Sequence, residues 1–93
     1  MIEFSDGRYR VHGPLTLTTV QPILLHSEPR FDGTDIRIDL SGVTETDSSA
    51  VGLLLAWTRA AAAHGGRISF ENLPGNLRAL IELYEVGELL PGA

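Results

Sequence analysis

The hydroxyl group of Ser48 is the side chain of this sequence best placed for chemistry. Ser48 follows Asp47 at the predicted start of a helix that runs to His64. Free backbone amides and the helix dipole favour a negative charge at such a position. A phosphate on Ser48 would add about two negative charges to a surface otherwise made of small residues. From the residues alone two interpretations stay open: Ser48 is a phosphorylation site, or its side chain merely caps the helix.

The other polar side chains do not form a catalytic or metal-binding pattern. The histidines fall in three different predicted elements without ligand-like spacing: His12, His26 and His64. Neither Ser48 nor Ser49 has a base beside it in the sequence, which argues against a catalytic nucleophile. Phosphate-binding loops, dinucleotide fingerprints, HExxH and nucleophile elbows are missing from the sequence. We therefore expect no enzyme, no metal site and no cofactor. Three carboxylates are interpreted as solvated or capping groups: Asp39, Glu45 and Asp47.

Composition and charge restrict the class of protein further. The length of 93 residues predicts a single domain over 1–93. The net charge of −5 argues against a nucleic-acid or anionic-membrane ligand. The absence of cysteine excludes disulfides. No apolar run reaches the roughly 18 residues that span a bilayer, and Met1 to Ser5 does not resemble a signal peptide. We expect a cytoplasmic protein without direct membrane insertion, and the oligomeric state stays open.

The helix predicted from Asp47 to His64, closed by Gly65-Gly66, has few polar residues. Two apolar columns at helical spacing are suited to cover a sheet: Leu54, Trp57 and Ala61, and beside them Val51, Leu55 and Ala62. The opposite column is made of small residues with one arginine: Ser49, Gly52, Ala56, Arg59 and Ala63. Gly52 costs about 1 kcal/mol relative to alanine inside a helix. Either the helix is simply alanine-rich, or this face is flat so that the backbone of another protein can approach it.

Alternating apolar and polar residues predict the strands. Segments 2–5 and 8–12 flank the turn Asp6-Gly7 and predict a hairpin, after which Gly13-Pro14 breaks the pattern. Residues 15–17 either extend the second strand or form a loop. Segments 35–40 and 67–71 are further strands. A helix is expected from Thr18 or Thr19 to about Ser27, and a last helix is expected after residue 75. The apolar face of that helix consists of Leu77, Leu80, Ile81 and Tyr84. Gly87 is predicted to cap the helix. The apolar tail Leu89-Leu90-Pro91 either folds back onto the chain or meets a partner.

Because every predicted strand alternates, the sheet should be apolar on one face only. Helices are therefore expected mainly on one face. The other face would carry polar side chains: Arg8, Arg10, Arg37, Asp39, Ser69 and Glu71. Strands joined through helices must run parallel, whereas the first hairpin is antiparallel. The predicted fold class is α/β, with a small mixed β-sheet of about four to five strands that begins with an N-terminal hairpin.

The order of these elements resembles that of the STAS domain family over almost the whole chain. The resemblance rests on Ile38–Val43, on the segment from Asp47 to Leu55, and on Gly65-Gly66 before a strand. This family includes bacterial anti-sigma factor antagonists and cytoplasmic domains of sulfate transporters. In the antagonists the serine after the aspartate is phosphorylated by a partner kinase, which the resemblance places at Ser48. Ala50 stands where many antagonists have glycine.

The C-terminal part is similar to the MlaB branch of the same family. The similarity lies in Leu73-Pro74 and in the apolar residues that follow: Leu77, Leu80, Leu83-Tyr84, Val86 and Leu89-Leu90-Pro91. MlaB is the small subunit of a phospholipid-transport ABC complex that supports outer-membrane lipid asymmetry. It binds and supports the cytoplasmic ATPase, and a hydroxyl residue after the aspartate matters for that contact.

The resemblance to MlaB implies a non-enzymatic protein that binds the ABC-transporter ATPase and lies at the inner membrane only through this partner. The expected contact residues are those of the small-residue face together with the hydroxyl at its start: Ser48, Ser49, Gly52, Ala56 and Arg59. The alternative is an anti-sigma factor antagonist that is switched by phosphorylation of Ser48 through a serine kinase.

Overall fold

A four-stranded sheet organises the computed structural model, which describes residues 2–5 and 7–92. The strand order is β1 (Ile2–Ser5), β2 (Arg8–Leu15), β3 (Ile36–Thr46) and β4 (Ile68–Glu71). β1 pairs antiparallel with β2, and the other two pairs are parallel. The predicted hairpin and the mixed sheet are therefore confirmed. Asp6, one of the two predicted turn residues, lies outside the described residues.

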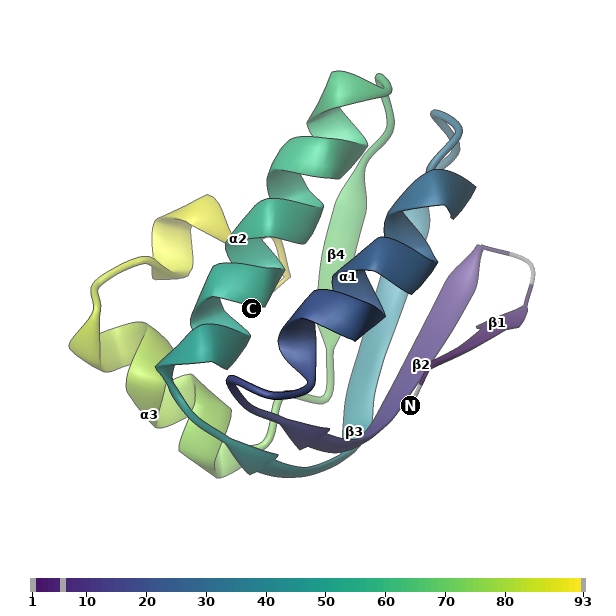
Figure 1. Cartoon of the computed structure of the whole chain (residues 1–93). Helices are drawn as coiled ribbons and strands as arrows, with labels where there is room; N and C mark the ends of the chain where they lie inside the picture. Colours follow the sequence, from purple (N-terminus) through teal and green to yellow (C-terminus); the bar gives the residue numbers. More distant parts are fainter. Residues whose placement is uncertain (1, 6, 93) are drawn as a thin grey trace.

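Three helices pack on one face of this sheet. α1 (Val20–Ser27) and α2 (Ser48–Ala63) lie side by side across the strands, and α3 (Gly75–Leu83) lies on the other side of α2 (Figure 1). Short 3₁₀ turns follow α1 and α3, at Glu28–Arg30 and Gly87–Leu89. The one-sided arrangement agrees with the alternating strands, because only one face of each strand is apolar.

Trp57 of α2 is the largest side chain that is fully buried in the core. Its ring stacks beside Phe70 of β4, with ring centroids 6.4 Å apart. Its indole N–H donates a 2.8 Å hydrogen bond to the hydroxyl of Ser27, and that hydroxyl donates to the Ile23 carbonyl oxygen at 2.8 Å. Ser27 is a buried polar residue at the end of α1. Its hydroxyl therefore provides the hydrogen-bond acceptor that the buried indole N–H needs.

Strands β2 and β3 are both longer than the sequence predicts. β2 continues through Gly13-Pro14, because the pairing register with β3 shifts between Gly13 and Leu15 and takes Pro14 out of the regular ladder. β3 continues through Ser41-Gly42 to Thr46. Gly42 is required by the close approach of the two strands, since a Cβ atom there would lie 2.7 Å from the His12 Cβ atom.

The end of α3 also differs from the prediction. The helix ends at Leu83, and Glu85 takes the left-handed conformation that was expected at Gly87. The Glu85 and Val86 amides donate to the carbonyl oxygens of Glu82 and Ile81, so a Schellman motif closes the helix without glycine. Tyr84 consequently follows the helix and is half exposed instead of belonging to its buried face.

The apolar tail folds back onto the sheet. Leu90 is buried, and the Pro91 carbonyl oxygen accepts a 3.0 Å hydrogen bond from the Phe70 amide of the edge strand β4. Leu89 stays exposed. Of the two predicted alternatives, folding back or meeting a partner, folding back is correct for Leu90 and Pro91. These two residues also partly cover the edge strand β4.

The helix-free face of the sheet carries a network of ion pairs. Arg8 contacts Glu71 at 3.0 Å and Asp39 at 3.9 Å, and Arg10 contacts Asp39 at 3.7 Å. Arg37 lies 3.8 Å from Glu71. The polar face is thus confirmed, and arginines of β2 and β3 pair on it with carboxylates of β3 and β4.

Asp39 is not the solvated or capping group that the sequence suggests, because it is buried in this network. The Ser41 amide and the Asn72 side-chain amide donate to its Oδ1 atom at 3.0 and 3.1 Å. These bonds stabilise the carboxylate, so the pKa of Asp39 falls from 3.8 to about 2. Alternation places Asp39 on the polar face, but the side chains of Arg8 and Arg10 from the neighbouring strand exclude water from it.

The lowered pKa of Asp39 predicts part of the acid sensitivity of the fold. The folded chain binds this proton more weakly than the unfolded chain, so the stabilisation is present above about pH 4 and is lost toward pH 2. We expect Asp39→Asn to flatten the fall in unfolding free energy over this range, measured by urea denaturation at several pH values. Asn72→Ala should move the fall to higher pH. Equal pH slopes for wild type and Asp39→Asn would contradict this assignment.

Candidate protein-binding surface

Asp47 caps α2 and also fixes the loop that precedes α1. Its Oδ1 atom accepts a 2.8 Å hydrogen bond from the Ser49 amide, and its Oδ2 atom accepts one of 3.0 Å from the Leu17 amide. Both bonds stabilise the ionised form and lower the pKa of Asp47, with the bond from Leu17 as the larger cause. Of the two predicted caps, Asp47 is the correct one.

The two hydrogen bonds of Asp47 predict separable effects. We expect Asp47→Ala to lower the unfolding free energy by about 1–2 kcal/mol, because it removes the cap. Asp47→Asn should cost less, since asparagine caps as well as aspartate but offers only one carbonyl oxygen for two amide donors. Hydrogen exchange at the Leu17 and Ser49 amides, together with denaturant unfolding, measures both effects. Equal stability losses in the two variants would show that the cap is not the main contribution.

Ser48 is the first residue of α2 and is exposed, so its hydroxyl is accessible and does not serve as the cap. The interpretation of Ser48 as a mere helix cap is therefore wrong. At the other end, Gly65 has a left-handed backbone with φ of +79°. The amides of Gly65 and Gly66 donate to the carbonyl oxygens of Ala62 and Ala61, which closes the helix as predicted.

The small-residue face of α2 points away from the sheet. Gly52, Arg59 and Ala63 are exposed, and Ser49 and Ala56 are half-buried. A Cβ atom at Gly52 would meet no heavy atom within 4 Å outside its own helical turn. Nothing in the described part of the chain therefore covers this position, and the face is open to another molecule.

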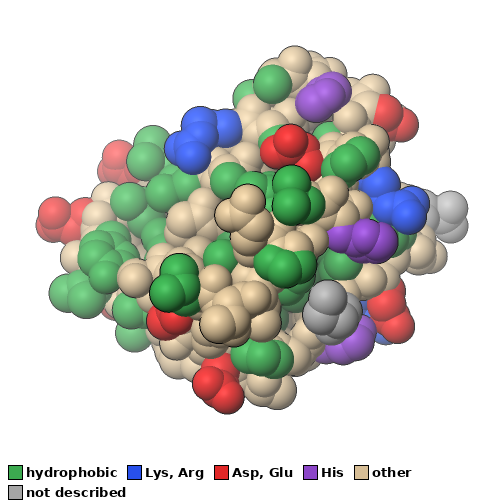
Figure 2. Space-filling model, in the orientation of Figure 1, with side chains coloured by type: hydrophobic (Ala, Val, Ile, Leu, Met, Phe, Trp, Pro, Cys, Tyr) green, Lys and Arg blue, Asp and Glu red, His purple; other side chains and the backbone are tan. Residues whose placement is uncertain are grey.

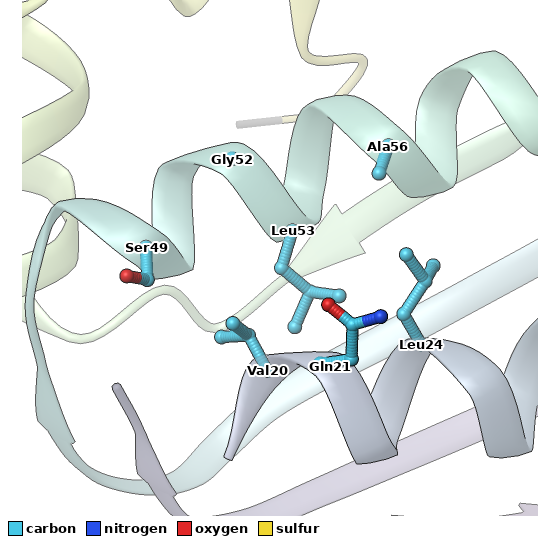
Figure 3. A pocket seen from close by; sticks show the side chains of 7 residues that line it. All are labelled: Val20, Gln21, Leu24, Ser49, Gly52, Leu53 and Ala56. Carbon is cyan, nitrogen blue, oxygen red and sulfur yellow. The ribbon is translucent and has the colours of Figure 1, made fainter. Parts of the chain in front are cut away.

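A groove of about 270 Å³ runs between this face and α1. Figure 3 shows its lining from the two helices: Val20, Gln21 and Leu24 from α1, and Ser49, Gly52, Leu53 and Ala56 from α2. The structure thus brings three of the five predicted contact residues together in one groove. The other two predicted contact residues do not line the groove: Ser48 is the first residue of α2, and Arg59 lies about one helical turn beyond Ala56.

The contribution of α1 to the groove does not follow from the predicted helix alone. Its apolar residues form one stripe in the sequence, but only Ile23 is fully buried, whereas Val20 and Leu24 remain partly accessible. Val20, Ile23 and Leu24 are apolar, but only Ile23 is needed to anchor α1 in the core. The two additional apolar residues were the sequence signal for a second groove wall. Leu17, which is 76% exposed beside Asp47, adds a further apolar side chain near the start of both helices.

The helical face as a whole is largely uncharged in its centre. Figure 2 shows mainly hydrophobic and uncharged side chains in the middle of this view, with one acidic group directly above them and most other charged groups nearer the outline. Several large apolar side chains are more than half exposed: Leu17, Leu25, Leu83 and Leu89. Among them, Leu17 lies close to the groove, beside Asp47 at the start of α2.

The histidines lie apart from the groove and from one another. His64 hydrogen-bonds the Ala60 carbonyl oxygen through Nδ1 at 2.9 Å, His26 packs against Phe4, and His12 lies 3.9 Å from a carboxylate oxygen of Glu3. Within residues 2–5 and 7–92, no cluster of three or more potential metal ligands of the His, Cys, Asp or Glu type is found. None of the helices in that part of the chain is long and apolar enough to cross a membrane.

A mixed sheet with helices on one face and an open, uncharged helix surface defines a protein-interaction domain of the STAS class. Comparison with family models supports this directly, since residues 2–91 match the model described as "Mlab, STAS domain". The chain therefore belongs to the MlaB-like group of the STAS domain family. Domains of this family act through protein–protein contacts.

Solved structures share the fold. The anti-sigma factor antagonist SpoIIAA in its unphosphorylated form is 23% identical, with a TM-score of 0.76, and the match covers 97% of this chain and 84% of SpoIIAA. A structure reported as Mglu is 18% identical with a TM-score of 0.65, and the match covers 81% of this chain but 20% of Mglu. No sequence match was found among curated proteins. At these identities the two structures support the fold alone.

Proposed function

We propose that this chain is a non-enzymatic subunit that binds the cytoplasmic ATPase of a phospholipid-transport ABC complex. The observation that carries the proposal is the open groove between α1 and α2, which is lined by apolar and small side chains and contains Gly52 without any covering group. The match to the MlaB-like family model indicates the class of partner. Ser48 would contact the ATPase at the start of α2, and the protein would reach the inner membrane through this partner.

Small residues suit such a contact for a physical reason. A helix face without long side chains allows a second backbone to approach closely, and little side-chain entropy is lost when the contact forms. Val20, Leu24 and Leu53 supply apolar area at the base of the groove. Because the groove lining itself has no charged side chain, filling the groove avoids the desolvation cost of a buried charge at that place.

Phosphorylation of Ser48, as in an anti-sigma factor antagonist, is the second candidate. It is favoured by the exposed hydroxyl of Ser48 at a helix start, where Asp47 and not Ser48 makes the capping bond. A phosphate there would place about two negative charges beside the groove and oppose an apolar contact. The two candidates use the same surface but require different partners.

Affinity purification of the full chain from its native cells distinguishes the candidates. Co-purification of an ABC-transporter ATPase, with Ser48 unmodified, is expected from the first. Recovery of a serine kinase and a mass increase of one phosphate on Ser48 would support the second and contradict the first. A Ser48→Trp variant that still retains the ATPase at wild-type yield would also contradict the proposed contact.

A further inference from the structure

We infer that the ATPase surface covering α2 is an apolar helix that carries a carboxylate opposite Arg59. This inference rests on the function proposed above and specifies the chemistry of the partner. It starts from the distribution of charge: the chain has 12 acidic and 7 basic residues, yet Arg59 is the only Asp, Glu, Lys or Arg residue in α1 and α2.

Arg59 has no ionic partner within the described residues. Three of the six other arginines, Arg8, Arg10 and Arg37, form ion pairs on the opposite face of the sheet. Arg30, Arg67 and Arg78 also have no ion pair among the described residues, but none of them belongs to α1 or α2. The neighbours of Arg59 on the same face of α2 are Ala56 and Ala63, whose side chains have no polar atoms. A carboxylate that pairs with Arg59 must therefore come from another molecule.

The cost of covering a guanidinium determines the chemistry of that molecule. An arginine that loses water at an interface is destabilising unless an acceptor replaces the water, and a carboxylate matches the guanidinium fork best. The groove next to it offers apolar and small groups only, apart from the side chains of Ser49 and Gln21. An occupant that fits both features has an apolar stripe and one acidic residue.

The spacing along α2 indicates the length of this occupant and the end of α2 that its carboxylate faces. Arg59 lies ten residues beyond Ser49, which corresponds to about 15 Å along the helix axis. A helix of about three turns spans that distance, with its apolar positions against Gly52 and Ala56 and its carboxylate toward the C-terminal end of α2. The inference runs against the net charge of −5, which by itself would favour a basic partner.

Charge substitutions at Arg59 test the inference. The dissociation constant of the full chain for the purified ATPase subunit is measured by titration calorimetry at low and high salt. We expect Arg59→Gln to weaken binding about 3- to 10-fold at low salt and to reduce its salt dependence. Arg59→Glu should weaken binding at least about 30-fold. Arg37→Glu, which reverses a charge on the opposite face and also loses the contact with Glu71, is the control for charge reversal and should change binding less than about twofold.

The outcomes separate this inference from the proposed function. Arg59→Glu binding as tightly as wild type, or more tightly, would overturn the carboxylate while leaving the ATPase as partner. Failure of the wild-type chain to bind the ATPase would overturn both. If the Arg59→Glu variant binds the ATPase weakly, the acidic residues of the ATPase are reversed in charge one at a time. One of these reversals should restore binding of the variant. Failure of every reversal to restore it would overturn the specific pair.

Discussion

Replacing Gly52 with leucine is expected to abolish binding of the ATPase subunit and to leave the chain folded. The position is open on the outer side of α2, because a Cβ atom there meets no heavy atom within 4 Å outside its own turn. A leucine would fill the groove beside Ala56. It would also hold the partner backbone away from α2, so we expect at least about a 100-fold loss of affinity, which corresponds to about 2.8 kcal/mol.

The stability of Gly52 variants should move in the opposite direction to their affinity. Gly52→Ala removes a helix-interior glycine and should raise the unfolding free energy by about 1 kcal/mol. Its single methyl group should affect binding much less than leucine does. Ala79→Leu, at an exposed small position of α3, is the matched control for added bulk on a helix surface. ATPase binding that survives Gly52→Leu would place the interface elsewhere.

Replacing Trp57 with alanine is expected to give the largest loss of stability of any single substitution considered. The side chain is fully buried between α1 and the sheet and stacks beside Phe70. Removing such an aromatic side chain costs about 3–5 kcal/mol, which is a large part of the 5–15 kcal/mol typical of a whole domain. Urea denaturation followed by circular dichroism measures the change in unfolding free energy.

The hydrogen bond between Trp57 and Ser27 is tested by a double-mutant cycle. Ser27→Ala leaves the buried indole N–H without its acceptor and should cost about 1–3 kcal/mol. The same substitution in a Trp57→Phe background should cost less, because no donor remains to be satisfied. Equal costs in both backgrounds would mean that the bond contributes nothing measurable. Ser49→Ala, on the opposite side of α2, is the control for loss of a serine hydroxyl.

The family and the architecture were predictable because their signals are local. Alternation in segments 2–5, 35–40 and 67–71 defines the apolar face of each strand, and a strand of period two can bury that face in only one way. The buried column of Leu54, Trp57 and Ala61 and the closing Gly65-Gly66 likewise depend on neighbouring residues. The second predicted column is only partly correct, because Val51 is buried but Ala62 is exposed. The open small-residue face was also visible, because a helix that packs on a sheet leaves its opposite side uncovered.

The ends of β2, β3 and α3 were predicted wrongly for a different reason. Gly13-Pro14 and Gly42 have poor strand propensity, yet they belong to β2 and β3 because the two strands approach closely there and the register shifts. Glu85 replaces the expected glycine because the tail beyond it is anchored by the burial of Leu90. In each case the packing of distant segments outweighs the local preference.

The sequence by itself determined the order and approximate positions of the strands and helices, and which helix carries the exposed small-residue face. Only the tertiary structure decided that α1 supplies the second wall of the groove and that Asp47 holds the Leu17 amide 30 residues away. It also decided that Arg8 and Arg10 bury the carboxylate of Asp39. The physical reason is that hydrophobic period is a property of adjacent residues, whereas a groove, a hydrogen bond or an ion pair between distant segments exists only once the core has fixed their separation.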